Sequence, residues 1–337
     1  MAAAGASGLY VNPNTGAAQA GLAPFRNALI NGDMRINQRG TSTNLASLST
    51  VVSATPWSWV ADRWNVFRGS VVTGGVIGQG TNLTTSDLPF NDAGIKTFAR
   101  VGRLSGNAAT NTVTLNYNME SQDCYRFIGK TVTLSFYYRT GANFSSTSII
   151  SRIYTGTGTD QALISGVTGI TTAGADSYNS NVSWQKKSLT CTLGTNINQI
   201  MLLFEYSPTG TAGAADYFDI TGVQLELGSV ATPFEVRPFP VELQLCQRYY
   251  QTGHYILNAY STGPGWGVRP YVHTLIVQSR VNLSASNLTY TNQPGTTNTS
   301  GFSGSIYYGN YGFLLSATPV AAGMYESVAI WILNAEL

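Results

Sequence analysis

Short stretches rich in β-branched and aromatic residues recur along this chain after residue 55, each closed by Gly, Asn, Ser or Pro. In one of them Val132, Leu134 and Phe136 alternate with hydroxyl side chains, which is the period of a strand with one buried face. Many strands without alternating helices favour an all-β sandwich or jelly roll over a parallel α/β sheet. The predicted strands are Trp59–Phe67, Phe98–Leu104, Thr112–Met119, Thr131–Arg139, Ser148–Tyr154, Val182–Leu193, Gln199–Tyr206 and Tyr217–Leu227.

The composition is consistent with an all-β protein and limits the classes of partner that the protein can bind. Only 10% of the residues are charged, against about 25% in an average soluble domain, so Asn, Ser, Thr, Gln and Gly must supply the polar surface. A net charge of +2 provides no basic field for a phosphate backbone, and we therefore expect neither nucleic acid nor an anionic membrane as partner. Apolar runs such as Ile200–Phe204 have strand length, well short of the roughly 20 residues of a membrane span.

Helical spacing over Pro240–Tyr250, with a proline suited to a first turn, predicts a short helical junction. Three prolines at positions 233, 238 and 240 make the preceding link stiff. The sequence thus divides into a flexible arm (1–24), a jelly-roll sandwich (25–239), the junction (240–250) and a smaller C-terminal β-sandwich (251–337). Strands of the last unit are predicted at Leu275–Val281, Asn287–Thr291, Ser305–Tyr308, Gly312–Ser316 and Glu326–Leu333.

The arm of residues 1–24 has no Lys or Arg and no continuous apolar block, so it lacks the features of a secretory signal. It is either an attachment segment or a terminus without a role. Cys124, Cys191 and Cys246 form no CxxC pair and are odd in number, which indicates buried small hydrophobic residues in a protein assembled in a reducing cytoplasm. The alternative is a single disulfide bridge between two of them.

Three groups of segments carry a resemblance to a known class. They resemble parts of a phage tail-fibre-type β-sandwich that is similar to carbohydrate-binding modules. The opening of the module is resembled by Asn27–Gly40 with Ala61–Trp64, and its inner strands by Gly129–Arg139 with Trp184–Lys187. Its end is resembled by Phe218–Gly228 with Thr232–Glu235 and Leu245–Tyr250. The resemblance covers residues 25–250. It implies a protein of a tailed-phage virion, assembled in the host bacterial cytoplasm, usually as a homotrimer.

Three functions follow as hypotheses. The first is a tail-fibre or spike component that adheres to a glycan-type receptor on the host surface. The second is a capsid decoration or head-fibre protein that attaches to other virion proteins through residues 1–24. The third, a depolymerase, is weak: His254 and His273 have no catalytic spacing, and the pairing of Glu205 with Asp216 or Asp219 depends on spatial separation. We expect no enzymatic activity.

Sugar sites need flat aromatic faces beside amides or carboxylates, which selects three candidate groups. Trp57 and Trp59 share one face of an extended strand, unless they are packing residues of the sandwich. Trp266 lies in a Gly-rich segment, where it is either exposed or closes the loop onto the small unit. The last group comprises Tyr307, Tyr308 and Tyr311. These tyrosines either form an adaptable binding surface, as in antibody paratopes, or are buried in a subunit interface.

A structural calcium ion is the one cofactor that the resemblance implies, and Asp33 and Asp219 are its candidate ligands. The sequence departs from the pattern, because Thr221-Gly222 stands where such modules carry paired aspartates.

The C-terminal unit is expected to form the trimer interface. It is small, so alone it would bury a low fraction of its surface, and closed symmetry would bury its many aromatic residues. These are Tyr255, Tyr260, Trp266, Tyr271, Tyr290, Tyr307, Tyr308, Tyr311, Phe313, Tyr325 and Trp331.

Overall fold

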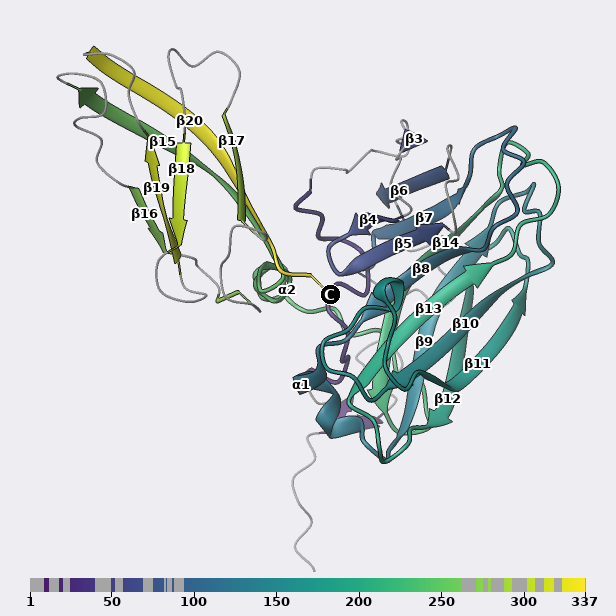
Figure 1. The fold of residues 1–337 in the computed structure, drawn as a ribbon. Coiled ribbons are helices and arrows are strands. Elements are labelled where there is room, and N and C mark those ends of the chain that lie inside the picture. The colour runs from purple at the N-terminus through teal and green to yellow at the C-terminus, as the bar shows by residue number, and fades with distance from the viewer. Residues whose placement is uncertain are drawn as a thin grey trace, which may run out of the picture.

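The computed structural model describes residues 9–11, 18–20, 25–39, 50–51, 57–68, 75–81, 83, 87, 94–261, 271–274, 278–279, 288–292, 302–306, 312–317 and 323–336. Two six-stranded antiparallel sheets face each other in a β-sandwich (Figure 1). Strands dominate the described residues, so the prediction of an all-β protein is confirmed. The helices in this part of the chain are short, and none of them has the length and apolarity of a membrane span.

The first sheet has the strand order β11-β10-β13-β8-β5-β4. Its strands are β4 (Trp57–Ala61), β5 (Trp64–Arg68), β8 (Val113–Asn118), β10 (Ser148–Gly156), β11 (Thr171–Asn179) and β13 (Gln199–Tyr206). Side chains alternate between its two faces. In β13, Ile200, Leu202 and Phe204 belong to the main core, whereas Leu203 and Glu205 lie on the outer face.

The second sheet has the strand order β12-β9-β14-β7-β6-β3. Its strands are β3 (Thr50–Val51), β6 (Gly75–Thr81), β7 (Thr97–Arg103), β9 (Thr131–Thr140), β12 (Gln185–Thr192) and β14 (Tyr217–Leu227). Its central strand β9 is buried on both faces, unlike the single buried face that its alternation indicates. On the outer face Tyr137 packs with Phe98 and Trp184 in a separate apolar cluster.

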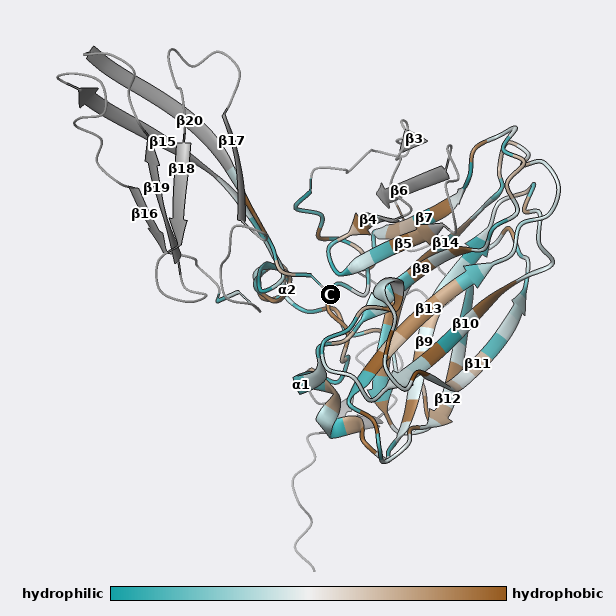
Figure 2. Ribbon diagram, viewed as in Figure 1, coloured by the Kyte–Doolittle hydropathy of each residue, from teal (hydrophilic) through white to brown (hydrophobic). Residues whose placement is uncertain are grey.

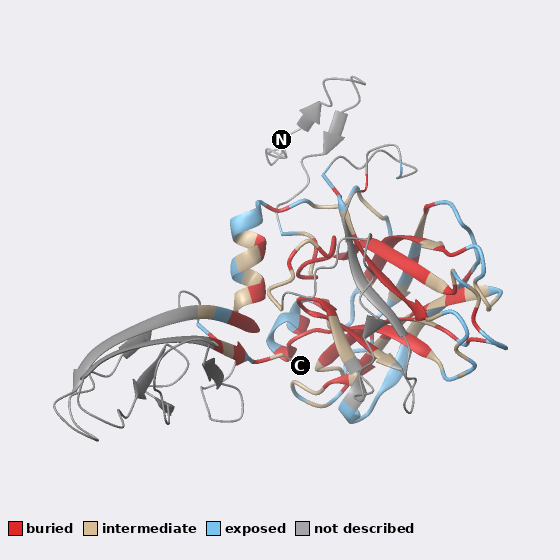
Figure 3. Ribbon diagram, turned by 90° about the horizontal axis from the view of Figure 1, so that it is seen from above, coloured by how far each residue is buried: buried red, intermediate tan, exposed pale blue. Residues whose placement is uncertain are grey.

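The main core lies between the two sheets and is rich in aromatic rings. Trp64 is fully buried, with its ring centroid 4.9 Å from that of Tyr117, and Phe136 of the second sheet meets Phe204 of the first at 4.7 Å. Hydrophobic positions recur along the strands of the sandwich (Figure 2), and many of the buried residues lie on these strands (Figure 3).

One predicted strand, Trp59–Phe67, is wrong: this segment forms the β4–β5 hairpin, which turns at Asp62 and Arg63. Arg63 adopts a left-handed conformation at φ 72°, unusual for a residue with a Cβ. Strand β11 was not predicted at all. The bounds predicted for Gln199–Tyr206 and Tyr217–Leu227 match β13 and β14.

Helix α2 (Phe239–Gln247) is the predicted helix, with proline in its first turn. The other helical pieces are α1 (Ser121–Cys124), η2 (Tyr125–Phe127) and η3 (Leu163–Ser165). Tyr250, predicted to end the junction, instead begins a strand. A cluster of Ile30, Ile36, Cys246 and Tyr249 packs the α2 region against the N-terminal segment of the sandwich.

Beyond α2 the described residues form two three-stranded sheets, ordered β15-β20-β17 and β16-β19-β18. Their strands are β15 (Tyr250–Ser261), β16 (Tyr271–Thr274), β17 (Leu288–Asn292), β18 (Phe302–Ile306), β19 (Gly312–Ala317) and β20 (Gly323–Asn334). The predicted strand Leu275–Val281 falls mostly outside the described residues, and β15 was not predicted. A further hairpin joins β1 (Leu9–Val11) to β2 (Ala18–Ala20).

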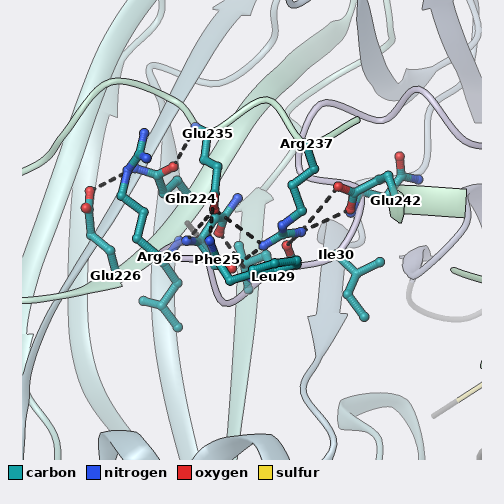
Figure 4. Close-up of polar contacts among 12 residues, drawn as sticks. Phe25, Arg26, Leu29, Ile30, Gln224, Glu226, Glu235, Arg237 and Glu242 are labelled. Atoms are coloured by element: carbon teal, nitrogen blue, oxygen red, sulfur yellow. Dashed lines mark hydrogen bonds and ion pairs between the residues drawn. The ribbon is translucent and has the colours of Figure 1, made fainter. Parts of the chain in front are cut away.

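A polar seam joins residues 25–39 to residues 223–242 (Figure 4). Arg237 donates hydrogen bonds to the carbonyls of Asn27 and Leu29 and pairs with Glu242 at 3.2 Å. The backbone N–H of Asn27 donates to Glu235 at 2.9 Å. These contacts are buried or half-buried. They replace the backbone hydrogen bonds of a β-sheet, which the irregular N-terminal segment lacks.

The end of the chain returns to the sandwich beside the β4–β5 turn. The backbone N–H of Ala335 donates to the carbonyl of Tyr249 at 2.7 Å. The carboxylate of Glu336 accepts from Arg39 at 3.2 Å and from the buried Arg63. The last residues are therefore part of the folded body, and Leu333 is fully buried.

Candidate functional site

On the outer face of the first sheet, the pairing of four neighbouring strands places four side chains in one row. Asn65 of β5 lies opposite Asn116 of β8, Asn116 lies opposite Leu203 of β13, and Leu203 lies opposite Arg152 of β10. Directly paired residues of an antiparallel sheet share a face, with Cβ atoms about 5 Å apart. The pairing thus assembles one site from residues that are distant in sequence.

A cavity of about 460 Å³ opens on this face. Its size is within the range of small-ligand sites, which run from about 300 to 1,000 Å³. Residues of β5, β8, β10, β11 and β13 form it together with η3, and no charged side chain is among its described lining residues: Phe67, Thr114, Asn116, Tyr154, Leu163, Ile170, Thr171, Thr172 and Leu203.

A pair of amides with unmet hydrogen-bonding capacity lies beneath the cavity, and Asn116 of this pair is among the lining residues. Asn116 Nδ2 donates to Asn65 Oδ1 at 3.1 Å and to Thr114 Oγ1 at 3.0 Å. Within the described part of the chain, Asn65 Nδ2 and Asn116 Oδ1 are buried without a hydrogen-bond partner. Since both residues are at least 99% buried, this unmet donor and acceptor indicate ordered water beneath the cavity.

An ion pair borders the cavity. Arg152 Nε donates to Glu205 Oε1 at 2.7 Å, and both side chains are partly exposed. Burial raises the pKa of the neighbouring Tyr154 above its usual range, so its phenol stays neutral at physiological pH. The site as a whole is uncharged, with aromatic walls at Phe67 and Tyr154.

Of the aromatic residues predicted for sugar binding, Trp59 lies on this sheet opposite Asn65. It is half-buried, and the guanidinium of Arg39 lies 4.5 Å from its ring centroid and 3.9 Å from that of Tyr250. This contact assigns Trp59 a packing role on at least one ring face. The backbone of Trp57 is opposite Phe67 in β4, and its side chain lies outside what the structure describes.

The other predicted sugar-binding residues, Trp266, Tyr307, Tyr308 and Tyr311, all lie outside the described residues. Their role stays a prediction.

The two predicted calcium ligands have cationic partners. Both oxygens of the fully buried Asp219 accept from Arg100, at 2.7 and 2.8 Å, and Arg139 donates to one of them at 2.7 Å. Asp33 lies 3.4 Å from Arg35. In the described residues, no group of three or more His, Cys, Asp or Glu side chains could hold a metal ion. These contacts do not favour the calcium prediction, which stays a prediction.

Each of the carboxylates considered for glycoside hydrolysis is paired with an arginine. Glu205 is on the outer face of the first sheet, paired with Arg152. Asp219 is on the outer face of the second sheet, because its neighbours Phe218 and Ile220 point into the core. Asp216 is buried against Arg103 at 2.7 Å. The sandwich separates Glu205 from Asp219.

Two other hollows differ from this cavity, because charged side chains are among their lining residues. One of about 430 Å³ lies between α1 and α2 and includes the seam residue Arg237. Another of about 770 Å³ lies where the edge strands β11 and β12 meet, beside Lys186 and Lys187.

Fold and site together define an all-β sandwich with a neutral, ligand-sized cavity on the outer face of one sheet. No family model matches this sequence, and no curated protein matches it.

Solved structures give distant similarities. A CBM4 structure is 17% identical with a TM-score of 0.28, over 39% of this chain and 71% of that chain. The C-terminal family 22 carbohydrate binding module of Clostridium thermocellum Xyn10B is 12% identical with a TM-score of 0.32, over 53% and 91%. The enzymatically active domain of tailspike protein 4 from bacteriophage CBA120 is 15% identical with a TM-score of 0.32, over 61% of this chain and 22% of that chain. Because these identities and TM-scores are low, the assignment of a β-sandwich rests on the order of the strands in this chain's own sheets.

Proposed function

We propose that this chain is a non-enzymatic glycan-binding protein of a bacteriophage virion, a tail-fibre or spike component that adheres to the host surface. The observation that carries the binding function is the 460 Å³ cavity itself, whose lining joins apolar and aromatic side chains to the uncharged polar groups of Thr114, Asn116, Thr171 and Thr172. Hydroxyl and amide groups both donate and accept hydrogen bonds, as the hydroxyl groups of a sugar require.

The walls support the same class of ligand. The rings of Phe67 and Tyr154 line the cavity and offer flat apolar surfaces for the apolar face of a sugar ring. The neutral lining fits an uncharged polymer and not a nucleotide or a polyanion. A protein with only 10% charged residues also presents few charges that would repel or attract such a polymer at long range.

Placement in a phage virion rests on the resemblance of residues 25–250. Within it, the tail-fibre or spike placement, with a homotrimer attached through residues 1–24, is the proposal. Head decoration is the alternative, and the number of copies per particle separates the two. A few copies in trimeric multiples fit the tail, whereas hundreds of copies fit the head.

The absence of enzymatic activity is likewise part of the proposal. Its support is that Glu205 and Asp219 are held by arginines on opposite faces of the sandwich, whereas glycoside hydrolysis needs two carboxyl groups about 5–10 Å apart. Shortening of the host polysaccharide during incubation with the purified protein would contradict it.

The binding function is tested by titrating purified full-length protein and its variants with surface polysaccharide extracted from the host. Asn116→Leu removes the amide from the cavity lining, and we expect binding at least tenfold weaker. Asn179→Leu on the exposed end of β11 is the matched control and should bind as the wild type does. Because Asn116 is buried, melting temperatures check folding, and Tyr154→Ala, at a half-buried wall position, provides a second variant. Wild-type affinity in both cavity variants would refute the site.

A further inference from the structure

We infer that the sugar seated in this cavity is a neutral 6-deoxyhexose within a glycan, an inference that rests on the proposed function. Its C6 methyl group, which stands where an ordinary hexose has a hydroxymethyl group, packs against the aliphatic side chains of the cavity.

The aliphatic part of the lining comes from three places in the chain. Leu203 lies in β13, Leu163 lies in η3, and Ile170 directly precedes β11. Ile170 is a large hydrophobic residue that is 45% exposed, so part of its apolar surface is open to a ligand. A hydroxyl group placed against these side chains would lose its hydrogen bonds to water without replacement, whereas burial favours a methyl group there. The aliphatic side chains therefore favour a sugar that carries a methyl group.

The polar side chains on the β8 side of the lining have no hydrogen-bond donor left. Both amide hydrogens of Asn116 are used, by Asn65 Oδ1 at 3.1 Å and by Thr114 Oγ1 at 3.0 Å. The hydroxyl group of Thr114 donates to the carbonyl of Phe67 at 3.2 Å.

The other hydroxyl groups of the lining pair across β10 and β11. Thr171 Oγ1 lies 2.8 Å from Thr155 Oγ1, and the phenol of Tyr154 is hydrogen-bonded to Thr172. Each pair uses one of its two hydroxyl hydrogens, while the oxygens keep lone pairs that can accept. The lining thus has more capacity to accept hydrogen bonds than to donate them.

This balance distinguishes a 6-deoxy sugar from an acetylated one. The ring hydroxyl groups of either sugar can donate to the hydroxyl oxygens of Tyr154 and Thr172. An acetyl group also supplies a methyl group, but its carbonyl oxygen only accepts and would be buried where few donors remain. The C6 methyl group of a 6-deoxyhexose requires no donor.

The cavity also offers no charge to an acidic sugar. Its described lining residues are all uncharged, and the neighbouring guanidinium of Arg152 is bonded to Glu205 at 2.7 Å. The carboxylate of an acidic sugar would lose hydration without gaining a counterion of its own. The inferred sugar is therefore neutral.

The test uses monosaccharides as competitors of host polysaccharide for binding to the full-length protein. L-Fucose is compared with L-galactose, and L-rhamnose with L-mannose, because the two sugars of each pair differ only in the hydroxyl group at C6. In at least one pair we expect the deoxy sugar to compete about tenfold better, which is within the range by which an apolar pocket discriminates against a single small group. Saturation-transfer NMR should show the C6 methyl protons of that sugar as the most strongly saturated.

Ile170→Ser is the informative variant, because this side chain is partly exposed and its replacement does not threaten the fold. It should weaken competition by the deoxy sugar about threefold, since less apolar surface is buried, without changing competition by the hydroxylated counterpart. Val182→Ser, also an exposed aliphatic residue but outside the cavity lining, is the matched control and should change neither.

The outcomes separate the two levels of the proposal. Equal competition within both pairs, or stronger competition by N-acetylglucosamine or glucuronic acid than by either deoxy sugar, overturns the 6-deoxyhexose inference. If no monosaccharide competes while Asn116→Leu abolishes binding of host polysaccharide, the inference is likewise wrong and glycan binding in the cavity stands. If the cavity variants keep wild-type affinity for host polysaccharide, both proposals are wrong.

Discussion

Arg63 and Glu336, 273 positions apart in sequence, are joined by two hydrogen bonds in the interior of the protein. The backbone N–H of Arg63 donates to one carboxylate oxygen at 3.2 Å, and Nη1 donates to the other. Both side chains are about 98% buried or more. The turn of the β4–β5 hairpin is thus fixed by the penultimate residue of the chain.

Replacement of Glu336 by Gln should destabilise the protein strongly. It leaves the buried guanidinium of Arg63 without its counterion, and breaking a buried pair in this way costs about 3–5 kcal/mol. The free energy of unfolding from urea titrations measures the loss. Asp176→Asn at an exposed position of β11 is the control and should stay within about 0.5 kcal/mol of the wild type. A loss for Glu336→Gln as small as that of the control would show that the pair is not stabilising.

Stability should increase as the solution is acidified from pH 7 towards pH 4. Burial raises the pKa of Asp33 and of Asp62 from 3.8 to about 6. Between these values the folded state binds more protons than the unfolded state, so the free energy of unfolding rises as the pH falls through 6. Each group contributes on the order of 2–3 kcal/mol.

Urea unfolding at a series of pH values checks this, with Asp62→Asn as the comparison. The variant should lose part of the pH dependence, because its amide does not titrate. A wild-type profile that instead rises from pH 5 to pH 7, and is unchanged in the variant, would contradict the assignment.

Trp59→Ala should affect stability more than glycan binding. The guanidinium of Arg39 lies between the rings of Trp59 and Tyr250, and the loss of this half-buried stack costs about 1–2 kcal/mol. Thermal unfolding measures the first effect and polysaccharide titration the second. A tenfold loss of affinity at unchanged stability would instead support the stacking platform that the sequence predicts.

The three cysteines should differ in reactivity. All are free thiols; Cys124 and Cys246 are buried and Cys191 is half-buried. Burial raises the pKa of Cys124 to about 12 and holds that of Cys246 well above its usual value of 9. A thiol reagent should therefore label Cys191 first in the native protein and all three in denaturant. Rapid native labelling of Cys246 would mean that the α2 region opens readily.

The strands with continuous apolar character were predictable, and the missed features have local causes. β13 has a continuous apolar run, Ile200–Phe204, and in β14 apolar residues alternate with polar ones between clear ends. β11 contains Gly174, Asp176 and Asn179, residues that are depleted in strands, and it exists because β10 pairs with it. The β4–β5 turn at Arg63 contains no glycine and no Asn-Gly pair, so the sequence does not mark it as a turn. Contacts with Glu336 hold its left-handed conformation instead.

The cavity could not be found from the sequence. Asn65 and Asn116 are single amides in separate strands, 51 positions apart, and neither stands out in so Asn-rich a chain. Only the register of β5 with β8 places them together. The sequence did direct attention to the strand of Trp59, at the edge of this sheet.

The segments that carry the phage resemblance have a structural role. Asn27, Glu235 and Arg237 lie in the polar seam, and Arg248 and Tyr249 both donate to the buried Glu120. Such residues identify a scaffold, because they fix how the chain closes on itself. They do not identify the ligand, which depends on the outer face of the first sheet.

The C-terminal unit is connected to the sandwich through two strands that are neighbours in one ladder. β15 leaves at Tyr250 and β20 returns at Asn334, and these two residues are directly paired. A unit whose two connections to the rest of the chain lie side by side can be replaced by another unit without changing the path of the remaining chain. Exchange of residues 251–333 would keep the closing residues Ala335 and Glu336, so one sandwich can carry different C-terminal units.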